Sequence, residues 1–475
     1  MNLDNLKQAT NPYLPSWEYI PDGEPYTFGD RVYVYGSHDK FNGNVYCMLD
    51  YVCWSAPVND LGNWRYEGVI FRKDQDPKNP DLQGNLYAPD VPIGPDGRYY
   101  LYYALSNGNH ISVAVCDTPA GQYEFYGDVH YENGELLGDR ASDEGQFDPG
   151  VITENGKTYL YTGFCPLGDK GRHGAFVTVL AEDMLTIIEE PHIIVPSSAY
   201  SEGTGFEGHE FFEAPSIRKK NGKYYFIYSS IQFHELCYAM SDSPTEGFEY
   251  CGVIVSNGDV GIDSYKPAEM TTMYCANNHG SMEKVGDDWY IFYHRHTNGT
   301  NYSRQGCFEK LTFNEDGTIV QAMMTSCGSV ANLKGEGYYP TYIACNLFTD
   351  EECRYVPWSG WMSDKFPKIT QDGGDGDEEI GYVTNMWNSA TAGFKFFDCK
   401  GVKKIAIYEM GYSNGKMEVR TEWDGPVLCE FPIDYANVVR KLEADIDIPD
   451  GVHSLYFTYR GEGWAELRGF ELICE

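Results

Sequence analysis

Residues 211–230 read FFEAPSIRKKNGKYYFIYSS. Asn221-Gly222 is a signal for a two-residue hairpin turn, and the aromatic run that follows it is typical of a β-strand. Glu213 precedes this hairpin inside the apolar stretch FFEAP. An ionised glutamate avoids apolar surroundings unless it is paired or its pKa is raised. The stretch therefore predicts a strand–turn–strand unit that is headed by an unusual carboxyl group.

The same unit recurs four more times along the chain. The other copies are YIPDGEPYTFGDRVYVYGS, LYAPDVPIGPDGRYYLYYA, QFDPGVITENGKTYLYTG and NNHGSMEKVGDDWYIFYHR, led by Asp22, Asp90, Asp148 and His279. The leading residue precedes a strand tyrosine by eleven residues in four of the five copies, and by ten residues in the copy of Asp90. Five repeats of short aromatic strands and tight turns predict five radial blades of antiparallel sheet, a five-bladed β-propeller.

Equivalent positions in the blades of a propeller converge on its central axis. We therefore expect the five leading residues to lie near one another at one mouth of the propeller. The alternative is that acidic residues merely occupy loops before hairpins, as they do in any β protein. The matched spacing of five copies favours convergence.

The chain has 475 residues, which is enough for two or three domains. It is rich in Gly and Tyr and lacks sustained helical periodicity, which predicts an all-β class. We assign residues 1–335 to the propeller. Residues 345–475 contain short strands without helices and predict a β-sandwich module of the jelly-roll kind.

The charge and cysteine patterns restrict the partners and the compartment. A formal net charge of −36 argues against binding to nucleic acid or to anionic membranes. No apolar run is long enough to span a membrane, and the N-terminal segment lacks the pattern of a secretory signal. The 14 cysteines are dispersed, so their spacing indicates neither disulfides nor a zinc site. We therefore expect a cytoplasmic protein.

Three segments carry a resemblance to a known family. NPYLPSWEYIPDGEPYTFGDRVYVYGSHD, FDPGVITENGKTYLYTG and EAPSIRKKNGKYYFIYS resemble the carboxylate segments of glycoside hydrolase family 43, over residues 11 to about 320. The resemblance implies a five-bladed propeller and hydrolysis with inversion of configuration. The C-terminal part is similar, more loosely, to family 6 carbohydrate-binding modules.

The resemblance also implies roles for the leading carboxylates. Asp22 would be the general base that activates water, Glu213 the general acid, and Asp148 the residue that orients the acid and tunes its pKa. An acid in this role needs a raised pKa, which the apolar FFEAP context favours. The family usually has Asp-Pro at the base, whereas Asp22 is followed by Gly23, so Glu24 remains a rival base.

Further residues are implied as binding groups. Trp54, Tyr87, Asp90 and Arg304 would contact the sugar, and His279 would hold a structural calcium ion on the propeller axis. Glu351 or Glu352 could bind a second calcium ion in the C-terminal module. Trp387, Tyr412 and Trp464 are candidates for sugar stacking in that module, although its aromatic platforms look incomplete.

The leading functional hypothesis is an exo-acting α-L-arabinofuranosidase that acts on oligosaccharides derived from arabinoxylan or xylan. The alternative is a β-xylosidase, or an enzyme with both activities, because the two sugars present similar hydroxyl patterns. Two other classes are a non-catalytic carbohydrate-binding propeller and a fructan-cleaving enzyme that retains configuration. The presence of all three carboxylates argues against the first of these classes, and the three-segment match argues against the second.

Overall fold

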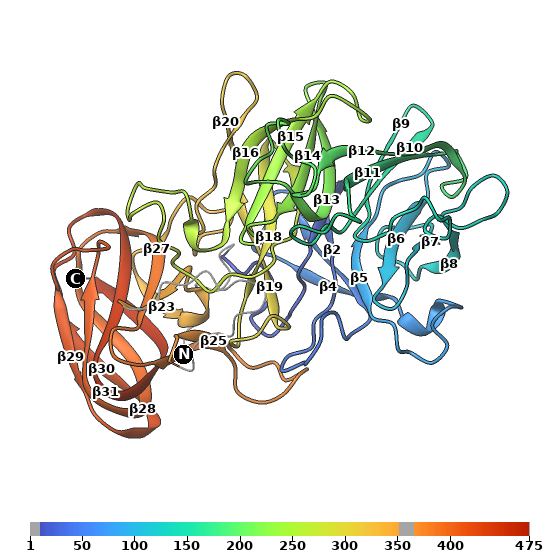
Figure 1. Ribbon diagram of the computed structural model, residues 1–475. Coiled ribbons are helices and arrows are strands. Elements are labelled where there is room, and N and C mark those ends of the chain that lie inside the picture. Colours follow the sequence, from blue (N-terminus) through green and yellow to red (C-terminus); the bar gives the residue numbers. More distant parts are fainter. Residues whose placement is uncertain (1–9, 351–364, 475) are drawn as a thin grey trace.

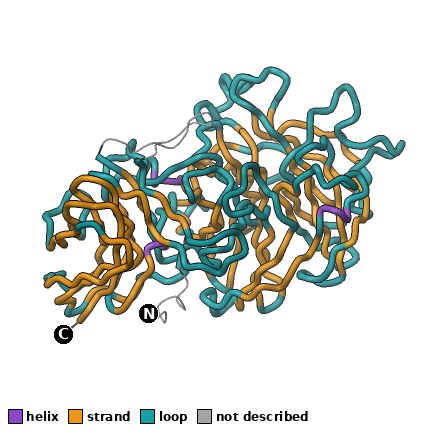
Figure 2. The backbone as a smooth tube through the Cα atoms, turned by 90° about the horizontal axis from the view of Figure 1, so that it is seen from below, coloured by secondary structure: helices purple, strands orange, loops and turns teal. Residues whose placement is uncertain are grey.

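The computed structural model describes residues 10–350 and 365–474, and in this part of the chain β-strands dominate. Five sheets are arranged radially, and a further sheet, drawn in orange to red, lies beside them (Figure 1). Strands and loops make up nearly all of the described chain (Figure 2), and the helices with printed bounds are single 3-10 turns: η2 (Lys73–Gln75), η3 (Asn257–Asp259) and η4 (Thr341–Ile343). The predictions of an all-β class and of a five-bladed propeller are confirmed.

Each of the first four blades is a meander of four antiparallel strands. Blade 1 contains β1 (Glu24–Phe28), β2 (Arg31–Tyr35), β3 (Tyr51–Pro57) and β4 (Arg65–Phe71). Blade 2 contains β5 (Leu86–Asp90), β6 (Tyr99–Leu105), β7 (Ile111–Cys116) and β8 (Glu124–Asp128). Blade 3 contains β9 (Gly150–Glu154), β10 (Lys157–Thr162), β11 (Gly174–Leu180) and β12 (Ile187–Pro196). Blade 4 contains β13 (Phe211–Lys220), β14 (Lys223–Ser230), β15 (Glu235–Ser241) and β16 (Glu249–Ser256).

The predicted hairpin turn joins β13 to β14. Asn221 and Gly222 both have positive φ, 52° and 85°, which is the geometry of a type I′ turn. Asn155 and Gly156 repeat it between β9 and β10, with φ of 53° and 75°. This turn suits the right-handed twist of the flanking strands, so the repeated Asn-Gly signal specifies the register of both hairpins.

Blade 5 is completed by the start of the chain. It has three strands, β17 (Met282–Val285), β18 (Asp288–His296) and β19 (Arg304–Lys310), and the small hairpin of β20 (Thr312–Phe313) and β21 (Ile319–Val320) follows. The backbone N–H of Tyr13 donates to the carbonyl of Gly306 (3.2 Å). The Asn11 side chain bonds the N–H and the carbonyl of Phe308, both at 2.9 Å. The N-terminal segment thus lies along β19 and closes the circle of blades.

A buried ionic network that includes the leading residue Asp90 joins the blades. The Arg218 guanidinium of blade 4 bonds Glu24 of blade 1 (2.9 Å) and lies 3.4 Å from Glu283 of blade 5. It also lies over the ring of Tyr26, 4.3 Å from the centroid. The hydroxyl of Tyr26 donates to Asp90 of blade 2 (2.6 Å), whose other carboxylate oxygen accepts the N–H of Val151 in blade 3 (2.6 Å). We call this set of side chains the axial network, and it links all five blades.

The C-terminal module is one strongly curled sheet of ten strands. Its strands are β22 (Leu333–Lys334), β23 (Gly337–Pro340), β24 (Asn346–Phe348), β25 (Lys368–Thr370), β26 (Tyr382–Met386), β27 (Thr391–Cys399), β28 (Val402–Arg420), β29 (Cys429–Ile433), β30 (Ala436–Asp445) and β31 (Gly451–Cys474). The pairing is antiparallel except between β22 and β27. The long strands β28 and β31 pair along most of their length, and this continuous ladder carries the curl.

The module packs tightly against blades 4 and 5. One apolar core runs from residues such as Ile227 and Tyr293 of the propeller to Phe394 of the module. At the same boundary the ammonium of Lys395 pairs with Asp259 (2.7 Å), and both side chains are fully buried. Such an interface makes the module part of the propeller's support.

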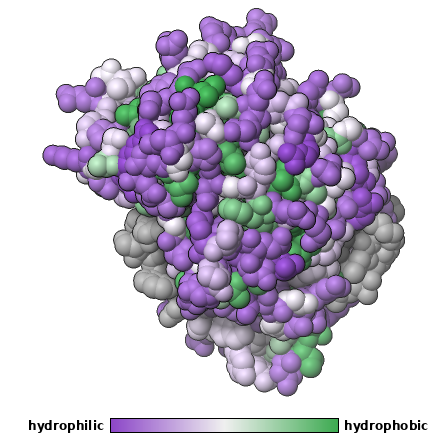
Figure 3. Space-filling model, turned by 90° about the vertical axis from the view of Figure 1, so that its right-hand side faces the viewer, coloured by the Kyte–Doolittle hydropathy of each residue, from purple (hydrophilic) through white to green (hydrophobic). Residues whose placement is uncertain are grey.

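The face of the molecule drawn in Figure 3 is mostly polar. Hydrophilic residues cover most of the face in Figure 3, and apolar side chains appear there as small separate patches. This agrees with the large negative charge of the chain. Among the described residues, no helix has the length and apolar character that crossing a membrane would require.

We predict that Arg218→Met lowers the free energy of unfolding by about 3–5 kcal/mol, because it leaves buried carboxylates without their cation. Urea unfolding followed by fluorescence measures this loss. Arg72→Met is the matched control, since Arg72 is half exposed and pairs with the equally exposed Asp74, and it should change stability by less than about 0.5 kcal/mol. Equal stability of Arg218→Met and the control would show that the axial network does not hold the blades.

Candidate active site

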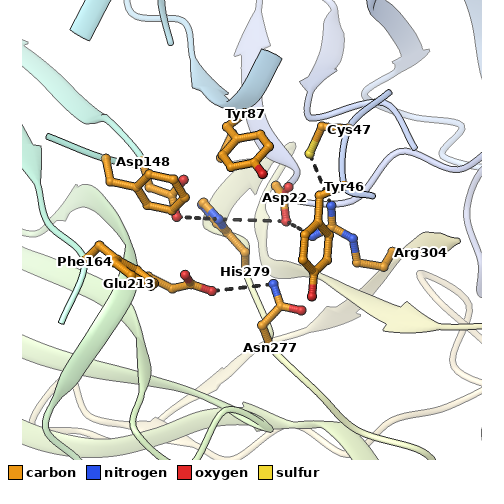
Figure 4. A pocket seen from close by; sticks show the side chains of 12 residues that line it. Asp22, Tyr46, Cys47, Tyr87, Asp148, Phe164, Glu213, Asn277, His279 and Arg304 are labelled. Carbon is orange, nitrogen blue, oxygen red and sulfur yellow. Dashed lines mark hydrogen bonds and ion pairs between the residues drawn. The ribbon is translucent and has the colours of Figure 1, made fainter. Parts of the chain in front are cut away.

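A pocket of about 220 Å³ opens where the blades converge (Figure 4). Its lining comes from every blade: Asp22, Tyr46, Cys47, Tyr87, Ala88, Phe147, Asp148, Phe164, Glu213, Asn277, His279 and Arg304. Four of the five predicted leading residues are among them, and Asp90 is the exception. The convergence that the repeat predicted is therefore observed at four of five positions.

Local backbone geometry turns the carboxylates into the pocket. Asp22 and Asp148, which lie two residues before the start of β1 and β9, have positive φ of 58° and 46°. Non-glycine residues seldom adopt this left-handed region, and functional sites are where such strain is found. Glu213 lies on β13 at a register shift, with Ala214 at φ 64°. A bulge of this kind re-aims a side chain that regular pairing would hold elsewhere.

Asp22 is surrounded by cationic and polar partners. The Arg304 guanidinium donates to Asp22 Oδ1 (2.9 Å), and His294 Nδ1 lies 3.2 Å from the same oxygen. Burial alone would raise the pKa of this carboxyl group, but the charge of Arg304, with help from His294, lowers it well below its usual range. Asp22 is therefore ionised at any physiological pH.

Arg304 is itself held by a second carboxylate. Asp39 accepts from the guanidinium through both of its oxygens, at 2.8 and 3.0 Å, and one of them also accepts the Arg304 backbone N–H (3.1 Å). The arginine also lies over the ring of Tyr46, 4.8 Å from the centroid. With an exposed fraction of only 2 %, Arg304 is fixed chiefly by Asp39 and by Asp22.

The opposite side of the pocket favours protonated carboxyl groups. Burial, followed by the negative charge of Asp22, raises the pKa of Glu213 to about 8, although Arg304 and a weak hydrogen bond from Asn277 oppose the rise. Burial also raises the pKa of Asp148 well above its usual range, and the charges of Glu213 and Asp22 add to the effect. The Asp148–Glu213 pair thus retains a proton at neutral pH.

His279 lies between the two sides. Its Nδ1 is 3.6 Å from Asp148 and 3.9 Å from Asp22, and burial lowers its pKa to about 4, so the ring is neutral. Calcium takes about six to eight oxygen ligands, whereas these residues offer one nitrogen and two carboxylates. This donor set by itself does not fit calcium, and the axial calcium ion remains a prediction.

Other predicted contacts lie elsewhere. Trp54 is outside the pocket lining, and its indole N–H donates to Glu18 (3.0 Å). Asp90 and the rival base Glu24 belong to the axial network and are outside the pocket lining, and the sugar contact of Asp90 stays a prediction. Both side chains accept hydrogen bonds from residues of other blades. Glu351 and Glu352 lie outside the described residues.

Several residues that line the pocket were not predicted from the sequence. Phe147 precedes Asp148 directly and Asn277 lies two residues before His279. Their proximity to leading residues could have predicted that they line the pocket. Tyr46 and Cys47 come from an irregular loop after β2, where no repeat position marks them. Asp39 lies in the same loop and supports Arg304 from a distance of 265 residues along the chain.

The C-terminal module presents an aromatic cluster of its own. Tyr412 and Trp464, two of the three predicted stacking residues, pair across β28 and β31 with ring centroids 5.8 Å apart. Tyr435 adds a third ring, 5.1 Å from Tyr412. Trp387 is held separately, by a hydrogen bond to Asn385 (2.8 Å).

The pocket combines an ionised carboxylate with a proton-bearing carboxyl pair across a small, largely buried space. Two carboxyl groups whose environments push their pKa values apart are the acid and base of glycosidic bond hydrolysis. On a five-bladed propeller, this arrangement is that of a glycoside hydrolase.

Comparison with known proteins agrees. The family model of glycosyl hydrolases family 43 matches residues 18–319. The chain belongs to this family.

Three relatives illustrate the similarity. A xylosidase/arabinosidase from Thermoclostridium stercorarium is 64 % identical over 99 % of this chain and 100 % of its own. A second relative is a family 43 β-xylosidase/α-arabinofuranosidase from a compost microbial metagenome, whose structure was solved in complex with xylotriose in a calcium-free form. Its sequence is 25 % identical, its TM-score is 0.51, and the match covers 66 % of this chain and 97 % of its own. An arabinoxylan arabinofuranohydrolase from Bacillus subtilis in complex with cellotetraose has a TM-score of 0.53 at 21 % identity, over 99 % and 98 % of the two chains, and shows the shared fold.

We predict that Arg304→Met moves the acidic limb of the kcat/KM profile to higher pH by about 1–3 units, because the pKa of Asp22 rises without its cation. Activity that requires ionised Asp22 is lost as the pH falls through that raised pKa. Asp39→Asn, which keeps Arg304 but loosens it, should move the limb in the same direction by less. An unchanged limb in Arg304→Met, with only KM altered, would mean that Arg304 acts on substrate alone.

Proposed function

We propose that the protein removes single pentose units from oligosaccharides derived from xylan or arabinoxylan, acting as both a β-xylosidase and an α-L-arabinofuranosidase. The observation that carries this proposal is the pairing of ionised Asp22 with the protonated Asp148–Glu213 pair inside one small pocket. The name of the relative that is 64 % identical supports the dual activity over the arabinofuranosidase that the sequence favoured.

The residues divide the chemistry between them. Asp22 accepts a proton from water, which attacks the anomeric carbon, while Glu213 donates its proton to the departing oxygen. Asp148 belongs to the same buried pair, in which burial and the charge of the neighbouring carboxyl group help to retain a proton that Glu213 can donate. Attack by water on the face opposite the leaving group inverts the configuration, and the base and acid then lie about 6.5–9.5 Å apart to admit that water.

The size of the pocket favours an exo-acting enzyme. Pockets for drug-sized ligands span about 300–1,000 Å³, whereas this one has about 220 Å³. A space of this size suits one sugar ring, with the rest of the oligosaccharide outside. Tyr46, Tyr87, Phe147 and Phe164 supply aromatic walls, and such faces pack on sugar rings without demanding one ring form. Xylopyranose and arabinofuranose are both pentoses, and both could satisfy the same few polar groups.

We predict that Asp22→Ala abolishes hydrolysis of every substrate, whereas Glu213→Ala is selective. Natural linkages need a proton on the leaving oxygen, so Glu213→Ala should slow them by about 10²–10⁴-fold. Dinitrophenyl glycosides, whose leaving group needs no proton, should be partly spared. Steady-state rates on both substrate types measure this difference. If Asp22→Ala stays active while Glu24→Ala is inactive, the base is misassigned.

We predict that the two activities compete for one site. In mixtures of a nitrophenyl β-xyloside and a methylumbelliferyl α-L-arabinofuranoside, each substrate should inhibit release of the other chromophore with a constant equal to its own KM. The two chromophores are read independently in one cuvette. Additive rates without mutual inhibition would require two sites, and absence of either activity would reduce the proposal to a single-specificity enzyme.

A further inference from the structure

Three metal-binding side chains converge in blade 4, outside the pocket. Glu235 and Cys237 lie two residues apart on β15 and so share one face of the strand. His209 comes from the loop before β13 and meets them there. Their ligand atoms all lie within 4.8 Å of one another, and within the described ranges 10–350 and 365–474 they are the only such group of His, Cys, Asp or Glu.

The spacing of these atoms is close to that of a tetrahedral metal site. Cys237 Sγ lies 3.8 Å from His209 Nδ1 and 3.3 Å from Glu235 Oε1, and His209 Nδ1 lies 2.6 Å from the same oxygen. Zinc bonds of about 2.0–2.3 Å imply separations of about 3.4–3.6 Å between ligand atoms. Two of the three distances already agree, and the third needs the imidazole and the carboxylate to part by less than about 1 Å.

The surroundings hold the three ligands in place. The His209 ring stacks on Tyr250 (centroids 4.9 Å apart, 13° between planes), and the Ser230 hydroxyl donates to Glu235 Oε1 (2.6 Å). Outer partners of this kind orient the ligands of protein metal sites. Glu210, next to His209, is buried, and its Oε2 has no hydrogen-bond partner among the described residues. The His209 side chain is 36 % exposed, which gives an ion a path to the site.

We propose that His209, Glu235 and Cys237 bind a zinc ion, with water as the fourth ligand. Nitrogen, oxygen and sulfur donors together suit zinc, whereas calcium requires oxygen ligands. On binding, the thiol of Cys237 releases its proton to solvent and Nδ1 of His209 binds as a neutral nitrogen, with no change of oxidation state. The site is distinct from the sugar pocket and from the predicted axial calcium ion.

The position of the site gives the ion a structural consequence. His209 precedes Glu213 by four residues, and β15 is two strands away from β13 in the same blade. Zinc would connect the segment that leads into Glu213 to β15, the third strand of the blade. Cysteine spacing along the chain gave no sign of this, because the ligands come from two segments 26 residues apart.

The test uses the full chain, stripped of metal with a chelator and then supplied with zinc chloride. After desalting, wild type should retain one equivalent more zinc than His209→Gln or Cys237→Ser, as measured by mass spectrometry of the metal. Zinc should raise the Tm of wild type and leave both variants unchanged, since a ligand that binds only the folded state stabilises it. His192→Gln is the matched control. His192 is exposed and its ring nitrogens bond the backbone carbonyls of Glu190 and Thr245, so this variant should behave as wild type.

Cobalt substitution tests the sulfur ligand in wild type without relying on a variant. Bound Co²⁺ should show thiolate-to-cobalt charge-transfer absorption, and Cys237→Ser should lack it. Equal zinc content in wild type and His209→Gln, or absence of the charge-transfer band in wild type, would each overturn the proposal. In that case the three side chains form only a hydrogen-bonded cluster.

Discussion

The buried guanidinium of Arg218 is the constraint on which the rest of the propeller depends. A cation removed from water is tolerated only where carboxylates and hydrogen bonds replace its hydration. Glu24 and Glu283 supply the charge, Tyr26 supplies an aromatic face, and Asp90 extends the network to a fourth blade. These groups come from several blades. The blades must therefore assemble in a single arrangement for the charge of Arg218 to be balanced.

The same strands carry the pocket one layer above. Glu24 follows Asp22 by two residues, and Arg218 follows Glu213 by five. The axial network thus sets the relative positions of the proposed base and acid. Within the pocket the charge of a second arginine, Arg304, lowers the pKa of carboxyl groups on both sides, and Asp22 also accepts a hydrogen bond from it. Arg304, anchored by Asp39, keeps Asp22 ionised, while burial and mutual repulsion keep a proton on the Asp148–Glu213 pair. The asymmetry between base and acid is therefore built from charge placement and burial, both of which exist before substrate arrives.

Much of the fold could be predicted from sequence, because its information is local and repeated. The Asn-Gly turns and the eleven-residue spacing identify blades, and blade symmetry then brings Asp22, Asp148, Glu213 and His279 together. Asp90 does not line the pocket because it pairs with Tyr102 as Glu24 pairs with Tyr35, and it therefore lies at the level of the axial network and not at that of Asp22. Asp39 and Arg218 could not be recognised in advance, because their partners are distant in sequence and no local pattern marks such contacts. The single curled sheet of the C-terminal module could not be predicted from the sequence either, because the sequence of a long bent strand resembles that of several short strands.

The central claim is that Asp22 and the Asp148–Glu213 pair act as base and acid on one water molecule. The most direct test is proton NMR of the sugar first released from a xylo-oligosaccharide, recorded before mutarotation equilibrates the anomers. A β-xylosidic bond should yield α-xylose first, with the β-anomer appearing only later by mutarotation. Initial release of β-xylose would mean that a carboxylate had formed a covalent intermediate, and the proposed division between base and acid would be wrong.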